Sequence, residues 1–218
     1  MKKQSVDFEE IKDYLQTGDL ILMHGLHSSS HVIETIEGSL WSHVTMVVLA
    51  SDIGIDADNE NILLWESDEM NPVKDVILKR GKSGPMLVKL SERLKYNLSQ
   101  KEDSIFAVRH LYAERNQKMY DIINNIIPIM HKSTFPDTFH EFLNPIEGRV
   151  FKKKTSLDTI FCSELIAYTY IKMGLLTSIH PVNSYAPVDF SEKLSVGLLK
   201  RAWLGDEIKL NIDLNKLK

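Results

Sequence analysis

Apolar residues follow two different periods along the chain, which predicts a β-rich first half and a more helical second half. Short apolar runs bounded by Gly, Pro, Asp and Asn are typical of strands, whereas spacings of three and four residues are typical of helices. Strands are predicted at 20–23, 41–50, 62–66, 73–78, 86–90 and 104–111. Helices are predicted at 5–16, 31–36, 114–131 and 160–173. This order, without repeats or a low-complexity linker, indicates a single α+β domain over 1–218.

Some side chains refine these predictions. Ser5 or Asp7 is expected to cap the first helix. Pro128 is expected to kink or shorten the helix at 114–131, because proline lacks the N–H group that an interior helical residue donates. The segment 51–61 is rich in Asp, Asn and Gly and is predicted to be a turn or loop between two strands that pair as a hairpin.

The composition is that of an ordinary globular chain of 218 residues, with 43% hydrophobic and 26% charged side chains. A formal net charge of -4 and the lack of a long basic stripe disfavour binding to nucleic-acid phosphates. The uncharged stretch at 38–51 is shorter than the ~20 residues of a membrane-spanning helix. The N-terminal residues lack the apolar core of a signal peptide. We therefore expect a soluble, cytoplasmic protein with no transmembrane segment and no nucleic-acid partner.

The chain contains one cysteine, Cys162, which excludes an internal disulfide and a multi-cysteine zinc site. Cys162 lies near the start of the predicted helix at 160–173, and Asp158 or Thr159 is expected to cap that helix. Unpaired N–H groups and the positive end of the helix dipole favour a thiolate there. A lone cysteine in an apolar helix is also commonly a small buried hydrophobic residue, so its position alone leaves both roles open.

A cysteine nucleophile needs a histidine base and a third group that orients the imidazole. His43 lies in the strongest predicted strand, and Glu66 ends the apolar strand that follows it. If the two strands pair, Glu66 can accept a hydrogen bond from one imidazole nitrogen while the other nitrogen faces Cys162. The alternatives are that His43 is a core histidine and that Glu66 begins an acidic turn at 66–69. Together the three residue types indicate a catalytic triad.

The Ser-His-Val strand at 42–44, the carboxylate on the next strand and the helix opening Phe-Cys-Ser-Glu-Leu at 161–165 resemble the permuted NlpC-type papain-like cysteine hydrolases, YiiX-like branch. The segments Thr-Gly-Asp-Leu-Ile-Leu at 17–22 and Tyr-Ala-Pro-Val-Asp-Phe at 185–190 also fit that family. The resemblance covers most of 17–190 and is weakest over 97–154, where we expect a helical or irregular insertion. It implies a circularly permuted papain-like fold, with an antiparallel sheet or half-barrel packed against helices that include the cysteine helix.

The resemblance also implies roles for individual residues. Cys162 would be the nucleophile, His43 its general base and Glu66 the residue that orients the histidine. The implied activity is that of a cysteine peptidase or amidase, which cleaves an amide in a small peptide or peptidoglycan-type fragment through an acyl-enzyme and needs no cofactor. The Cys162 N–H group would donate to the oxyanion. Residues expected to border the cleft and contact substrate are His24, Gly25, Ser28, Ser42 and Tyr185.

Two alternatives to the hydrolase remain open at this point. A lipid- or thioester-dependent acyltransferase would use an apolar surface such as 126–130, although that run also fits the core face of a helix. A binding module could retain the fold without catalysis. His24, His27 and His31 fall within eight residues, but their spacing is not a zinc signature and we expect no metal. The sequence does not indicate an oligomeric state.

Overall fold

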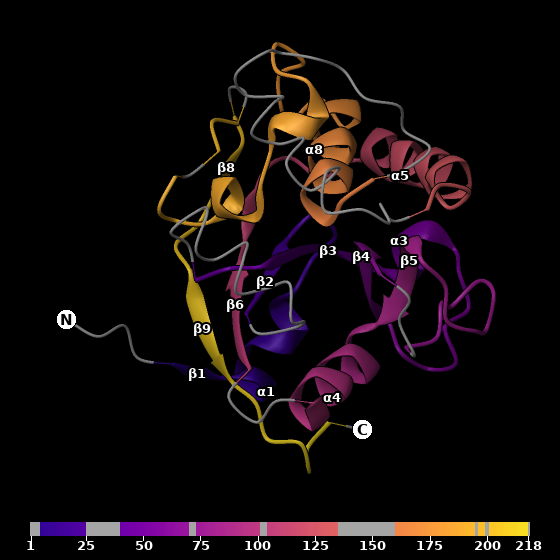
Figure 1. Cartoon of the computed structure of the whole chain (residues 1–218), viewed down its shortest axis with the longest axis vertical. Helices are drawn as coiled ribbons and strands as arrows, with labels where there is room; N and C mark the ends of the chain where they lie inside the picture. Colours follow the sequence, from indigo (N-terminus) through magenta and orange to yellow (C-terminus); the bar gives the residue numbers. More distant parts are fainter. Residues whose placement is uncertain are drawn as a thin grey trace.

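A seven-stranded sheet forms the central layer of the computed structural model (Figure 1). The structure describes residues 5–24, 40–69, 73–100, 104–134, 160–194, 196–198 and 201–217. The strand order is β1-β9-β6-β2-β3-β4-β5, and a separate two-stranded ribbon joins β7 to β8. The strands are β1 (Val6–Asp7), β2 (Leu20–His24), β3 (His43–Leu49), β4 (Ile62–Asp68), β5 (Gly84–Lys89), β6 (Ile105–Arg109), β7 (Leu111–Tyr112), β8 (Trp203–Leu204) and β9 (Ile208–Asn211).

The sheet is mixed, because β1 and β9 pair in parallel while the other neighbouring strands pair antiparallel. The predicted α+β class is therefore confirmed, whereas the expected antiparallel sheet or half-barrel is a mixed sheet that is parallel at its β1 edge. The predicted hairpin is present, with Met46 opposite Trp65 and Leu49 opposite Ile62. On the other side of β3, His43 lies opposite Met23 of β2.

Helices cover both faces of the sheet (Figure 1). They are α1 (Phe8–Ile11), α3 (Ala50–Ile53), α4 (Leu90–Gln100), α5 (Gln117–Met130) and α8 (Cys162–Lys172), with 3-10 turns at Lys12–Tyr14, Val182–Ser184 and Pro187–Phe190. Side chains alternate across a strand, so each strand contributes to two cores. Leu22, Met46 and Trp65 pack in the core that contains α5 and α8. Their neighbours Ile21, Val47 and Leu64 pack in the core of α1 and α4. No helix in the described parts of the chain is long and apolar enough to cross a membrane.

Local hydrogen bonding explains several departures from the predicted elements. Segment 73–78 was predicted as a strand, but Asp75 makes only an isolated bridge to Val88. The Asp75 carboxylate accepts hydrogen bonds from the N–H groups of Ile77, Leu78 and Leu87, which holds this segment in a turn. The helix predicted at 5–16 is divided into β1, α1 and a 3-10 turn, although the predicted cap Asp7 does accept from the Glu9 N–H group.

The later helices also differ in detail. The helix predicted at 114–131 begins at Gln117, where Asn116 caps it, and it continues through Pro128 to Met130. Helix α4 was not predicted, nor was α3, which ends at Gly54 in a left-handed conformation with φ 66°. The predicted helix at 31–36 lies outside the described residues.

The segment 97–154, expected to be an insertion, contributes β6 to the sheet between β2 and β9. Its helix α5 buries Ile123 and Ile127 in the same core as the cysteine helix α8. Residues 135–154 lie outside the described part of the chain. The described half of the segment is therefore built into the sheet and core.

Candidate active site

Cys162 is the first residue of α8 and is only 7% exposed. The residue before the helix is Phe161, so the expected cap at Asp158 or Thr159 is wrong; the Phe161 N–H group instead donates to Glu164 Oε2 at 3.1 Å. Ser67 on β4 donates to the Ile160 carbonyl at 2.6 Å, which ties the segment before the helix to the sheet. The N–H group of a first helical residue has no acceptor within the helix, so the Cys162 N–H can serve a ligand.

His43 and Glu66 form a buried hydrogen-bonded pair. Glu66 follows Trp65, which lies opposite Met46, so Glu66 and His43 are diagonal neighbours on one face of the sheet. The distance from His43 Nε2 to Glu66 Oε2 is 3.0 Å, and neither side chain is exposed by more than a few per cent. The predicted contact between the two residues is therefore present. Glu66 does not begin a turn, because β4 continues to Asp68.

Arg93 on α4 approaches the same face of the sheet and is fully buried. Its Nη2 atom lies 3.1 Å from Glu66 Oε2 and also donates a short hydrogen bond to Asp68 Oδ2. Burial acts to lower the pKa of Arg93, but the charges of Glu66 and Asp68 outweigh it and raise the pKa. Glu66 Oε1 and Arg93 Nε and Nη1 have no hydrogen-bond partner among the described residues. The arginine thus supplies the countercharge that a pair of buried carboxylates requires.

The imidazole of His43 is held in its charged form. Burial disfavours the imidazolium, but the charge of the nearby Cys162 and its interaction with the ring, the hydrogen bond to Glu66 and the charge of Asp68 together raise the pKa of His43 to about 10. The hydrogen bond of well-defined geometry is the one to Glu66, and Cys162 acts on the imidazole chiefly as a close electrostatic neighbour. The structure therefore brings all three predicted catalytic residues together.

The five expected substrate-contact residues do not all lie beside the candidate active site. Tyr185 lies beside the start of α8, where its carbonyl accepts from Ser163 Oγ at 2.8 Å, and its ring is buried against Phe190. The Ser42 hydroxyl is turned to the Met23 carbonyl at 3.4 Å. His24 ends β2 with Nδ1 at 2.7 Å from the Leu40 carbonyl. Gly25 and Ser28 lie outside the described residues.

Sequence reasoning missed two members of this cluster, Arg93 and Asp68. A signal was present, because Glu66 and Asp68 are two residues apart on a strand and therefore share a face. Two inward carboxylates need a buried cation. The sequence does not say which of the basic residues supplies it, since Arg93 lies on a helix that was not predicted.

The described residues contain no group of three or more His, Cys, Asp and Glu side chains that could hold a metal ion. Two of the three clustered histidines, His27 and His31, lie outside that part of the chain.

Comparisons with known proteins give a likeness to solved structures but none to a family model or a curated protein. The solved structure of the metalloprotein yiiX from Escherichia coli O157:H7 is similar at 16% sequence identity with a TM-score of 0.45. The match covers 72% of this chain and 64% of that one.

Proposed function

We propose that this protein is a cysteine hydrolase, a peptidase or amidase of the circularly permuted papain-like type, that cleaves an amide through an acyl-enzyme on Cys162. The observation that carries the proposal is the buried pair of His43 Nε2 and Glu66 Oε2 at 3.0 Å, beside a cysteine at the first residue of a helix. These are the nucleophile, base and orienting group that covalent acyl transfer requires.

The charged state of His43 suits the first chemical step. With Nε2 directed to Glu66, Nδ1 is the nitrogen that can exchange a proton with Cys162. The Cys162 thiolate attacks the amide carbonyl carbon, and the His43 imidazolium then donates its proton to the departing amine as the C–N bond breaks. Water, deprotonated by the neutral imidazole, attacks the resulting thioester and releases the carboxylic acid and the thiolate. The imidazolium is thereby restored for the next cycle.

Arg93 acts through Glu66 as a positioning residue. A carboxylate buried without a countercharge would take up a proton or move towards water. The Arg93 guanidinium, shared between Glu66 and Asp68, supplies the countercharge and holds the Glu66 carboxylate in place beside the imidazole. Orientation of the ring by a hydrogen-bonded carboxylate fixes which nitrogen faces the thiol.

The start of α8 supports stabilisation of the oxyanion. The tetrahedral intermediate places a negative charge on the substrate oxygen near the attacked carbon. The N–H group of Cys162, which has no acceptor within the helix, and the positive end of the helix dipole favour that charge.

The proposed substrate is a small peptide or a peptidoglycan-type fragment, as the family resemblance implies. Tyr185 is the expected contact residue that the position beside α8 best supports. An acyltransferase that uses lipid donors gains no support from the apolar run at 126–130, because Ile126, Ile127 and Met130 are buried in the core.

Mass spectrometry of the intact protein tests the proposal. The wild type is incubated with a panel of N-acylated dipeptides and muropeptide fragments, and a covalent adduct on Cys162 is sought together with the released amine. We expect an acyl adduct and multiple turnovers in the wild type, none in Cys162→Ala, and strongly reduced turnover in His43→Ala. Iodoacetamide labelling of Cys162 should also be faster in the folded protein than in the urea-denatured protein.

Four results would count against the hydrolase. Labelling no faster than in denatured protein would remove the activated nucleophile. A long-chain acyl adduct formed from lipid or thioester donors, without any from peptides, would identify an acyltransferase. Turnover by Cys162→Ala equal to that of the wild type would reject Cys162 as the nucleophile. No turnover by the wild type on amides, esters and thioesters would make a binding module of this fold the better interpretation.

A further inference from the structure

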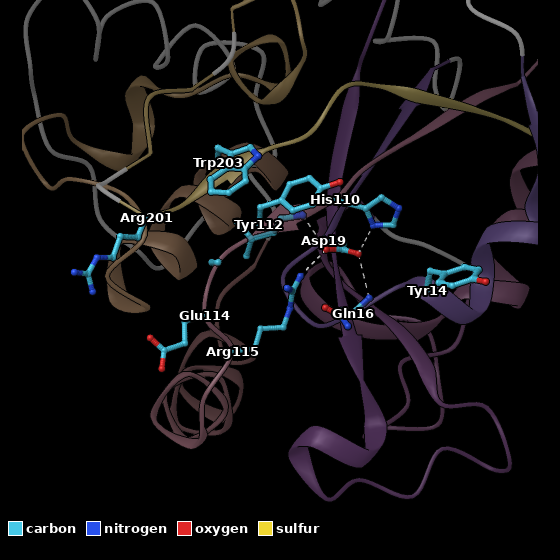
Figure 2. A pocket seen from close by; sticks show the side chains of 11 residues that line it. Tyr14, Gln16, Asp19, His110, Tyr112, Glu114, Arg115, Arg201 and Trp203 are labelled. Carbon is cyan, nitrogen blue, oxygen red and sulfur yellow. Dashed lines mark hydrogen bonds and ion pairs between the residues drawn. The ribbon is translucent and has the colours of Figure 1, made fainter.

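A second candidate site is a pocket of about 660 Å³ that is lined by Asp19, Tyr112 and Trp203, among others (Figure 2). Tyr170 on α8 donates from its hydroxyl to the Gly18 carbonyl at 2.6 Å, next to Asp19 in the pocket lining. The helix between Cys162 and Tyr170 rises by about 12 Å, so this pocket is separate from the candidate active site. Its volume falls in the range of small-molecule sites.

Two exposed aromatic rings form one wall of the pocket. Tyr112 on β7 and Trp203 on β8 are directly opposite each other in the ribbon, and their rings stack with centroids 5.1 Å apart and planes inclined by 10°. Tyr112 is 48% exposed and Trp203 is 59% exposed. Gly205 leaves room for this arrangement, since a Cβ atom there would lie 2.9 Å from the Tyr112 ring. The two stacked rings therefore present a flat apolar surface that a ligand can cover.

The floor of the pocket is a closed ionic network around Asp19. Its carboxylate accepts from Arg115 Nη2 at 2.7 Å and from the Leu111 and Gln16 N–H groups, and it pairs with His110 Nδ1 at 2.8 Å. Figure 2 shows these contacts converging on the carboxylate. The charge of Asp19 is thus balanced within the protein.

The remaining polar side chains around the pocket are unengaged. Tyr14, Gln16, Glu114 and Arg201 line it, and their side chains make no hydrogen bond or ion pair with any residue that the structure describes. Glu114 and Arg201 lie at the side of the pocket away from Tyr14 (Figure 2). Because one carries a negative and the other a positive charge, the unengaged groups have no net charge.

We propose that this pocket binds a neutral saccharide. A sugar ring has a flat face of C–H groups, which suits the electron-rich face of an aromatic ring, and an edge of hydroxyls that both donate and accept hydrogen bonds. The Tyr112–Trp203 stack offers the first surface, while Gln16, Glu114 and Arg201 offer acceptors and donors for the second. A phosphate-bearing ligand is disfavoured, because Arg115 is already paired with Asp19 and the unengaged Glu114 carboxylate, on the same side of the pocket as Arg201, would repel a phosphate. This proposal does not rest on the hydrolase activity.

Tryptophan fluorescence tests the proposal directly. Of the three tryptophans, Trp41 and Trp65 are buried, so quenching by acrylamide reports on Trp203. The wild type is titrated with cellotriose, maltotriose and triacetylchitotriose, which are neutral probes of different linkage and substitution. We expect at least one to protect Trp203 from acrylamide in a saturable manner, and the same saccharide to bind Cys162→Ala with unchanged affinity.

Saturation-transfer NMR on the saccharide extends the test to variants without Trp203. Trp203→Ala should weaken binding about tenfold or more, and Trp203→Tyr should recover part of it because the ring face is retained. Ile129→Ala, which truncates an exposed apolar side chain on α5 away from the pocket, is the matched control and should bind as the wild type does.

The proposal is overturned if none of the three saccharides protects Trp203 up to its solubility limit. Protection by adenosine monophosphate in their place would show that the pocket takes a charged planar ligand. Equal loss of binding in Trp203→Ala and Ile129→Ala would place the saccharide elsewhere. Binding weakened in Trp203→Ala, partly recovered in Trp203→Tyr and unchanged in Ile129→Ala supports it.

Discussion

Replacing Cys162 with alanine should lower the pKa of His43. In the wild type, burial works against the imidazolium, and the charge of Cys162 and its interaction with the ring are the largest effects that oppose burial. The hydrogen bond to Glu66 and the charge of Asp68 follow. The variant removes the contribution of Cys162 and leaves the burial and both carboxylates in place.

The expected fall in the pKa of His43 can be worked out from how far this pKa is raised in the wild type. The pKa of His43 rises from 6.5 to about 10, and at ~1.36 kcal/mol for each pH unit this corresponds to about 5 kcal/mol in favour of the imidazolium. Cys162 leads three favourable contributors, so its loss should remove at least about a third, which lowers the pKa of His43 by more than about one pH unit. Because the pKa in the folded state is the higher one, protonated His43 stabilises the fold; this contribution is complete below about pH 6.5 and is lost as the pH rises through about 10.

Long-range proton–nitrogen NMR spectra of histidine-labelled protein measure this directly, because they follow Nδ1 and Nε2 separately through a pH titration. Glu66→Gln serves as the comparison variant and should lower the pKa of His43 less than Cys162→Ala does, since the hydrogen bond to Glu66 is the smaller contribution. The amide spectrum checks that each variant is folded.

A pKa of His43 in Cys162→Ala within a few tenths of the wild-type value would refute this reasoning. The carboxylates would then hold the imidazolium without help, and Cys162 would not be its electrostatic partner. A larger fall in the pKa of His43 in Glu66→Gln than in Cys162→Ala would also show that Glu66, and not Cys162, is the main electrostatic partner of the imidazole.

Three further predictions concern the structure around the two sites. Arg93→Met should lower the free energy of unfolding by about 3–5 kcal/mol in urea denaturation, because it leaves two buried carboxylates without a cation. The control variant Lys95→Met, on the same helix, should change the free energy of unfolding by less than about 1 kcal/mol. Gly18→Ala should lower the melting temperature more than Gly54→Ala, because both have positive φ but only the Cβ at position 18 meets Leu111, at 2.7 Å. Ser67→Ala should slow iodoacetamide labelling of Cys162 while the amide spectrum stays native, since Ser67 anchors the segment before the helix.

The sequence was sufficient to predict the strands that carry the candidate site. The hairpin of β3 and β4 follows from long β-branched and apolar runs, and its register brings His43 and Glu66 together. These features are local, since pairing of consecutive strands needs only a short connection.

Features that depend on distant contacts could not be predicted. Arg93 reaches Glu66 from α4, and packing against the sheet sets the position of this helix. A helical pattern in the sequence does not show which carboxylate a residue of that helix will meet. Asp75 fails to form a strand because its own carboxylate takes up the N–H groups of the turn. The Tyr112–Trp203 stack joins residues far apart in the chain, which only the ribbon of β7 and β8 brings together.

The Thr17–Asp19 segment makes hydrogen bonds to β3, to α3 and to the C-terminal half of α8. Thr17 donates to Asp52 at 2.6 Å and accepts from the Leu49 N–H group, so it ties the end of β3 to the start of α3. The Gly18 carbonyl accepts a hydrogen bond from Tyr170 and so holds the C-terminal half of α8. The Asp19 carboxylate accepts from the Leu111 N–H group and from Arg115 at the floor of the pocket. Cys162 is the first residue of α8, and Gly18 holds Tyr170 near the last turn of the same helix. The Thr17–Asp19 segment thereby helps to fix the position of the Cys162 thiol. The Thr17–Asp19 segment is therefore best explained as an anchor of the helix that carries Cys162.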